Sequence, residues 1–224
     1  MDSGKPYNPE AAPRRAARSA PGVALAALLL AMQVCAGAAV PAEPTGSPGA
    51  QDVIAELSHQ LFAELARESA AFRSSGEKAL PLIDRLLAPH FDAGYSARLV
   101  LGRHWNEASP TQRQAFAAAF YQTLLRTYAG AVAAWTPERF RLLPASGDPA
   151  ALQVTVRTLV TSPGGAVTPV DYRLRMTPEG WKIFDVVVEG VSYDRSYRDD
   201  VDADVSRNGL DFVIARLSRR PGQR

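Results

Sequence analysis

Cysteine and histidine are both scarce in this 224-residue chain, with one and three residues. The one cysteine, Cys35, has no partner for an intramolecular disulfide, and His59, His90 and His104 do not have the spacing of zinc ligands. Neither a GxxxxGK phosphate-binding loop nor a GxGxxG motif after a strand is present. These absences exclude a disulfide scaffold, argue against a metal centre and give no indication of a cofactor.

Long apolar runs are also scarce, and the one that stands out is Gly22–Val34, which has 13 residues. A stable membrane-spanning helix needs about 20 such residues. The run is preceded by a basic segment with Arg14, Arg15 and Arg18 and is followed by the small residues CAGAAVPA. This order is typical of a secretory signal peptide, so residues 1–38 are predicted to be removed, with cleavage as late as Ala42.

Removal of this segment changes the charge of the chain. Four of the 25 basic and two of the 23 acidic residues are lost, which leaves 21 of each sign. A formally neutral chain gives no electrostatic indication of nucleic-acid binding. Residues 39–51 are rich in Pro, Gly and Ser and are predicted to be a flexible leader. Residues 52–224 are predicted to form a single domain with a sizeable core.

The first part of this domain has the periodicity of helices. Apolar residues recur at steps of three and four from Ile54 to Leu65. The pattern breaks at Arg73–Lys78, which reads RSSGEK. Two shorter helices are predicted after the break, around Leu82–Leu87 and Asp92–Trp105.

A long helix is predicted next, and it has the clearest start in the chain. Ser109 is a good N-cap, Pro110 occupies the first helical position, and Gln112 completes a capping box. Apolar and aromatic residues follow at four-residue steps, beginning with Phe116. This spacing predicts a helix that runs to about Ala134.

The hydrophobic period then changes to two, which indicates strands. Four strands are predicted: RFRLLP (139–144), ALQVTVRTLV (151–160), VDYRLRM (170–176) and WKIFDVVV (181–188). The second and third alternate cleanly, as antiparallel strands with one apolar face do, whereas the fourth is apolar on both faces. Val201–Leu217 is predicted to be one interrupted helix or two short ones. The predicted fold class is α+β, with N-terminal helices and the long helix packed on a curved four-stranded antiparallel sheet and a C-terminal helix.

Acidic residues and a serine at the end of the fourth strand raise the question of catalysis. Ser192 lies in GVSYD, which differs from a GxSxG nucleophile elbow because Asp194 replaces the second glycine. A Ser192–His–Asp triad is not excluded, since triad members need not be adjacent in sequence. The alternative is structural, because Asp185 and Glu189 need hydrogen bonds or cations if they are buried. Arg195 and Arg198 are nearby arginines that could pair with them.

Several segments, in order along the chain, resemble one family. LGRHWNEASPTQRQAFAAAFYQTLLRTYAG (Leu101–Gly130) resembles the signature helix of the MlaC, or toluene-tolerance auxiliary, family. GWKIFDVVVEGVSYDRSYR (Gly180–Arg198) resembles its other signature, a Trp-Lys strand that runs into Glu-Gly-Val-Ser. Phe91-Asp92 and NGLDFVIARL (Asn208–Leu217) match the flanking pieces. The resemblance covers nearly all of the mature chain.

The resemblance implies a periplasmic carrier of a Gram-negative bacterium, without catalysis. Such proteins hold a phospholipid by its acyl chains and shuttle it between two membranes, which maintains the lipid asymmetry of the outer membrane. The implied partners are an outer-membrane lipoprotein complex and an inner-membrane ABC transporter with its membrane-anchored substrate-binding subunit. A related branch is associated with hopanoid loci, so the lipid could also be of that class.

An apolar pocket between the sheet and the helices is therefore expected. A two-chain phospholipid has roughly 30 methylenes, and at about 0.8 kcal/mol each their exposure to water costs roughly 25 kcal/mol. A carrier must cover this surface with apolar faces. The candidate lipid-binding residues are Phe116, Phe120, Leu124, Val154, Val156, Val160, Tyr172, Leu174, Met176, Phe184, Val186, Val188 and Val191. The face of the fourth strand that lines the pocket is left open, because both faces are apolar.

Two alternatives from other functional classes remain at this point. The first is an enzyme on a cone-shaped α+β sheet, in which Asp185 or Glu189 acts as acid or base. The second is a periplasmic adaptor that binds only proteins and fills its apolar interior with its own side chains.

Overall fold

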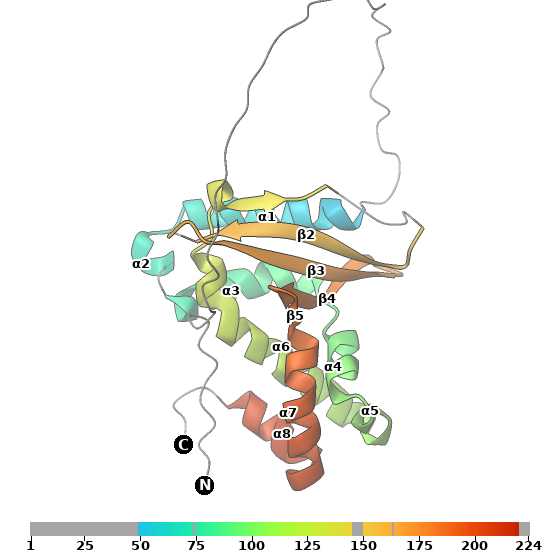
Figure 1. Cartoon of the computed structure of the whole chain (residues 1–224). Coiled ribbons are helices and arrows are strands. Elements are labelled where there is room, and N and C mark those ends of the chain that lie inside the picture. The colour runs from blue at the N-terminus through green and yellow to red at the C-terminus, as the bar shows by residue number, and fades with distance from the viewer. Residues whose placement is uncertain (1–48, 74, 145–149, 163, 220–224) are drawn as a thin grey trace, which may run out of the picture. The chain divides into compact units, whose positions relative to one another are not determined.

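A computed structural model describes residues 49–73, 75–144, 150–162 and 164–219 of the chain (Figure 1). The predicted signal peptide lies outside these residues, as does the leader up to residue 48. In the described part, none of the helices has the length and apolar character needed to cross a membrane.

Helices make up most of the described chain. They are α1 (Ala50–Ala66), α2 (Ala70–Arg73), α3 (Gly76–Leu87), α4 (Ala93–Leu101), α5 (His104–Glu107), α6 (Pro110–Ala133), α7 (Tyr193–Asn208) and α8 (Leu210–Ser218), with 3₁₀ turns η1 (Ala88–His90) and η2 (Pro137–Arg139). The C-terminal region thus consists of two helices and not of one interrupted helix, which was the other predicted form. The first of them, α7, begins at Tyr193, eight residues before the predicted start at Val201.

The sheet is antiparallel, and each strand pairs with the next one along the chain. The strands are β1 (Phe140–Leu142), β2 (Gln153–Thr161), β3 (Val167–Thr177), β4 (Gly180–Val188) and β5 (Val191–Ser192). The α+β class is confirmed, but the predicted number of four strands is wrong, because β5 adds a fifth. A two-residue turn joins β4 to β5, with Glu189 at φ 52° and Gly190 at φ 83°. Positive φ at both positions is the backbone of a type I′ hairpin turn.

The long helix α6 starts as its sequence predicts. The Ser109 hydroxyl accepts a hydrogen bond from the Gln112 amide at 3.2 Å, and the Gln112 side chain accepts one from the Ser109 amide at 3.0 Å. Pro110 fills the first helical position, where its missing N–H costs nothing. Helix α6 ends at Ala133, close to the predicted end at Ala134.

The helices form a layer that extends away from the sheet. Figure 1 shows α4, α5, α7 and α8 projecting together from one side of it, whereas α1 runs alongside β2. Helix α6 packs against α3 through one part of its surface and against α4 and α8 through another. It therefore forms the axis of the helical layer, whereas the buried cluster on the sheet is formed with α1.

Candidate functional site

One face of the sheet is apolar, as the alternation of β2 and β3 predicted. The strand register pairs Val156 with Tyr172 and Tyr172 with Val186, so these three side chains share a face. We call this side the apolar face. Its remaining members are Val154, Thr158, Val160, Val170, Leu174, Met176, Trp181, Ile183 and Val188. The opposite side, the polar face, carries Thr155, Arg157, Asp171, Arg173, Arg175, Lys182 and Asp185.

The two faces of β4, which the sequence left undecided, are distinguished by a β-bulge. The register between β3 and β4 shifts between Arg173 and Leu174, which leaves Phe184 without a partner residue. Phe184 lies with the polar face, because the Arg173 guanidinium stands 5.1 Å from its ring centroid and Tyr95 of α4 contacts it edge-on. An extra residue interrupts the period of two. Phe184 is therefore separated from Val186 and Val188, although all three were candidate lipid-binding residues.

The buried apolar side chains of the described residues form three clusters. The first joins α1, α3 and α6, the second joins α4, α6, α7 and α8, and the third joins α1 to the apolar face. Most domains of this size have one contiguous core. The division separates the buried apolar side chains on the sheet from those between the helices.

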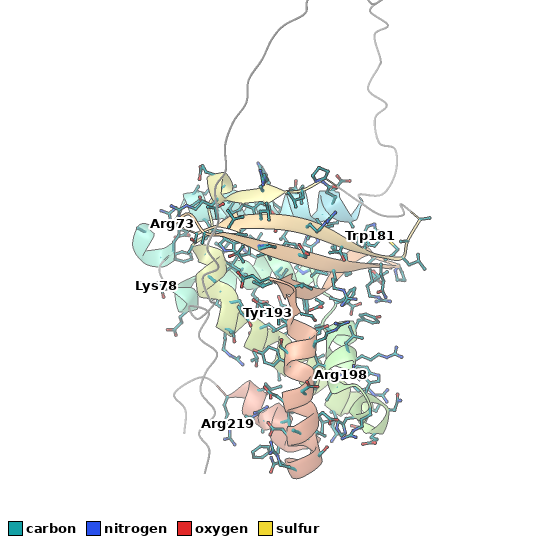
Figure 2. All side chains as sticks on the ribbon, in the orientation of Figure 1. Arg73, Lys78, Trp181, Tyr193, Arg198 and Arg219 are labelled. Carbon is teal, nitrogen blue, oxygen red and sulfur yellow. The ribbon has the colours of Figure 1, made fainter. Side chains whose placement is uncertain are left out.

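The boundary between the apolar face and α6 is marked by tyrosines. Tyr128 of α6 and Tyr193 of α7 stack with ring centroids 4.3 Å apart and an interplanar angle of 11°. Burial raises the pKa of Tyr172 above its usual range, and the nearby Tyr193 adds to the shift. The three rings thus link the sheet to α6, and Figure 2 shows Tyr193 where α7 leaves the sheet. Val186 and Val188 beside them are only half-buried.

The predicted pocket residues fall into groups. Val154, Val156, Val160, Tyr172, Leu174, Met176, Val186 and Val188 share the apolar face. Phe116 and Phe120 lie in the helical cluster of α4, α6, α7 and α8, fully buried and stacked on each other, and Leu124 packs at its margin. Leu174 is also fully buried, whereas Val191 is 53% exposed. Tyr128 and Tyr193 were not among the predicted residues, although both carry the amphipathic side chain suited to a boundary.

Asp185 is fully buried on the polar face and is satisfied by three donors. The Ser192 hydroxyl donates to it at 2.6 Å, the Asp194 amide at 3.2 Å and the Arg173 guanidinium at 3.3 Å. The expectation that Asp185 accepts hydrogen bonds is confirmed, and its cation is Arg173, directly opposite in the strand register, instead of Arg195 or Arg198.

Ser192 has a structural position in this network. Its hydroxyl donates to Asp185 and accepts the Arg195 amide at 3.2 Å, so it caps the N-terminus of α7. In the part of the chain that the structure describes, no histidine hydrogen-bonds to Ser192, and His104 contacts Asp202 at 2.9 Å instead. The network therefore fastens β3 and β4 to α7, and it does not have the geometry of a Ser-His-Asp triad.

Asp194 continues this network to α4. Ser96 donates to its Oδ1 at 2.8 Å, while its buried Oδ2 has no hydrogen-bond partner among the described residues. Burial, with a smaller contribution from the negative charge of Asp185, raises the pKa of Asp194 to about 8. Asp194 is therefore mostly protonated at neutral pH. The described ranges also contain no group of three or more His, Cys, Asp or Glu side chains that could hold a metal ion.

Fold and site together define the class: an α+β protein in which an antiparallel sheet and a helical layer surround a divided apolar interior. The family model for the MlaC protein matches residues 55–219. Toluene tolerance protein Ttg2D of Pseudomonas putida is 27% identical over 176 residues, which cover 78% of this chain and 81% of that protein. The fold is similar to that of a solved phospholipid-binding protein from Ralstonia solanacearum in complex with a phospholipid, with a TM-score of 0.66. The two chains are 26% identical, and the match covers 77% of this chain and 100% of that one. The chain belongs to the MlaC family.

Proposed function

We propose that this protein is a periplasmic carrier that binds a phospholipid by its acyl chains, and that it is not an enzyme. The observation that carries the proposal is the half-buried boundary between the apolar face and α6, in a chain that matches the MlaC family along residues 55–219. The phospholipid complex of the relative from Ralstonia solanacearum supports this ligand class.

The acyl chains would lie along the apolar face where it is least packed. Tyr172, Val186 and Val188 are half-buried in the middle and at one end of the sheet, and Val191 is exposed beside them. In the other part of the face, Leu174 is fully buried in the third cluster together with Ile54 of α1. Lipid entry would therefore occur at the β4–β5 turn, with the stacked Tyr128 and Tyr193 at its rim.

The wider role that we propose is transport between membranes. The carrier would exchange phospholipid with an outer-membrane lipoprotein complex and with the membrane-anchored substrate-binding subunit of an inner-membrane ABC transporter, and so maintain outer-membrane lipid asymmetry. Family membership supports this role. Energetically, the acyl chains move between two apolar environments, so the exchange is nearly neutral and the partners determine its direction.

Lipid extraction and native mass spectrometry of protein purified without detergent test the proposal. We expect a co-purifying lipid, and its mass distinguishes a phospholipid from a hopanoid. If no lipid co-purifies and none is taken up from vesicles, the proposal is wrong.

A pair of matched variants tests the location of the site. Val191→Glu places a charge at the proposed entry, and we expect uptake of phospholipid from vesicles to fall at least tenfold, because a carboxylate is costly against acyl chains. Val191 is 53% exposed, so the variant should still fold. Leu152→Glu is the control, because Leu152 is 72% exposed at the opposite end of the sheet. Equal uptake by both variants would refute the proposed entry.

A further inference from the structure

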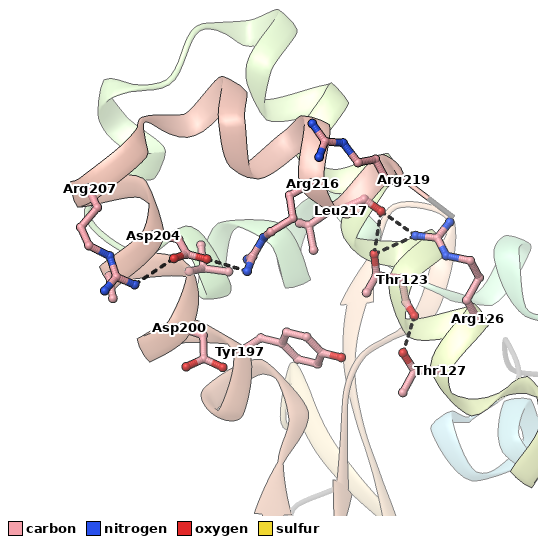
Figure 3. Close-up of a pocket in the computed structure, with 12 residues that line it drawn as sticks. Thr123, Arg126, Thr127, Tyr197, Asp200, Asp204, Arg207, Arg216, Leu217 and Arg219 are labelled. Carbon is pink, nitrogen blue, oxygen red and sulfur yellow. Dashed lines mark hydrogen bonds and ion pairs between the residues drawn. The ribbon is translucent and has the colours of Figure 1, made fainter. Parts of the chain in front are cut away.

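A cavity lies within the helical layer, away from the sheet. It has a volume of about 570 Å³ and opens between α6, α7 and α8 (Figure 3). Its lining is Thr123, Arg126, Thr127, Tyr197, Asp200, Val201, Ala203, Asp204, Arg207, Arg216, Leu217 and Arg219. None of these residues belongs to the sheet, so we treat this cavity, the helical groove, separately from the apolar face.

Four arginines and two aspartates line the helical groove, which gives it a net positive charge. Asp204 is shared by Arg207 at 2.9 Å and Arg216 at 2.6 Å. Among the described residues, Arg126 and Arg219 have no carboxylate partner. The groove therefore has guanidinium groups whose charge its own acids do not neutralise.

Arg126 is held in a fixed position. Its Nη2 donates both to the Leu217 carbonyl at 2.6 Å and to the Thr123 hydroxyl at 3.0 Å. Its Nε and Nη1 groups make no hydrogen bond to the described residues, so three N–H donors of a half-buried guanidinium remain available. Figure 3 shows Arg126 on one wall and the Tyr197 ring pointing into the groove from α7.

We propose that the helical groove binds a phosphate group, with Arg126 as its principal ligand. A guanidinium that is already positioned loses little entropy on binding, and the Nε–H and Nη1–H groups of Arg126 can each donate to an oxygen of a phosphate. Arg216, Arg219 and Tyr197 supply further donors around the same space. Donors from several directions suit a tetrahedral phosphate better than a planar carboxylate with two oxygens. The phosphate belongs either to a lipid headgroup or to a free phosphate compound.

Titration of the purified protein with inorganic phosphate at constant ionic strength tests this site. Binding is followed by calorimetry and by the NMR signal of the Arg126 Nε–H. We expect Arg126→Gln to weaken binding about tenfold or more, because a charged hydrogen-bond donor is lost. Arg126→Lys should also weaken it, since lysine keeps the charge but lacks the planar set of N–H donors that is fixed by Leu217 and Thr123. Arg141→Gln is the control, because Arg141 is exposed on β1 outside the groove, and it should leave binding within about twofold.

Arg219→Gln gives a second test that does not depend on the folding of an Arg126 variant. Arg219 is exposed and makes no described side-chain contact, so its replacement should weaken phosphate binding without affecting stability. Absence of phosphate binding at millimolar concentration, equal binding by the Arg126 and Arg141 variants, or acetate binding as tight as phosphate would each overturn the proposal.

The source of the phosphate is found by repeating the titration after incubation with vesicles of phosphatidylethanolamine and phosphatidylglycerol. If the groove holds the headgroup of a carried lipid, which rests on the proposed function, the loaded protein no longer binds free phosphate. If it binds a separate compound, loaded and unloaded protein bind phosphate equally. Lipid uptake is measured independently, so failure of the carrier proposal and failure of the phosphate site are distinguishable.

Discussion

The crossing of α3 and α6 predicts opposite effects for two neighbouring glycines. A Cβ at Gly76 would lie 2.9 Å from the backbone nitrogen and 3.1 Å from the Cα of Gly130. Backbone atoms cannot rotate aside as a side chain can, so Gly76→Ala must move one helix against the other. Such overpacking costs about 1–3 kcal/mol. For a domain of this size, each kcal/mol lowers Tm by about 2–4 °C.

Gly130→Ala at the same crossing is the matched control. Its Cβ would lie 3.6 Å from the Cα of Gly76, which is ordinary van der Waals contact. Replacing glycine by alanine inside a helix also favours the helix by up to about 1 kcal/mol. We expect Gly130→Ala to be neutral or stabilising while Gly76→Ala is destabilising. Both are measured by thermal and urea unfolding of delipidated protein, because a bound lipid would stabilise the folded state.

The comparison would refute the structural reasoning in two ways. If Gly76→Ala is as stable as the unmodified protein, α3 and α6 do not approach as closely as described. If both substitutions destabilise equally, the shorter approach of a Cβ at Gly76 (2.9 Å) than of a Cβ at Gly130 (3.6 Å) does not affect stability. Either result would also weaken the description of the interior, because α6 forms one of its walls.

Two further predictions concern Asp194 and the β4–β5 turn. The folded protein retains a proton on Asp194 up to about pH 8, whereas the unfolded chain releases it above pH 3.8. The free energy of unfolding therefore falls as pH rises between these values, by up to about 1.4 kcal/mol per pH unit. Asp194→Asn should flatten this dependence in urea unfolding at pH 5 and pH 8, and an unchanged slope would contradict the assignment. Glu189 has φ 52°, which asparagine tolerates better, so Glu189→Asn should stabilise by about 0.5–1 kcal/mol in the same assay. A loss of stability would count against a type I′ turn.

Local signals in the sequence predicted the long helix and most of the sheet. The capping box of Ser109 and Gln112 acts within one turn, so neighbouring residues determine it. The start of α7 was missed because Tyr193–Asp200 is strongly charged and lacks an apolar period. What starts this helix is the Ser192 cap, whose hydroxyl is positioned by Asp185 from another strand. The sequence alone does not show that contact.

The candidate site was predicted less completely, because it depends on how elements pair. Four-residue spacing grouped Phe116, Phe120 and Leu124 on one side of α6, but the partner of that side is the helical cluster with α4, α7 and α8. Phe184 and Val186 were likewise both candidate lipid-binding residues, and only the register with β3 reveals the bulge that separates them. Periodicity identifies which residues share a face, whereas tertiary packing decides what that face contacts.

The two acids near the end of the sheet are explained by the helix that they position. Buried carboxyl groups cost free energy unless they are paired or protonated. Asp185 is paired with Arg173 and two further donors, and Asp194 is mostly protonated at neutral pH. Through Ser192, Asp185 positions the start of α7, and the first residue of that helix is Tyr193, which stacks on Tyr128 of α6. The polar face of β4 thus positions the helix start beside the apolar face, which gives a structural reason for Asp185 in a largely apolar strand.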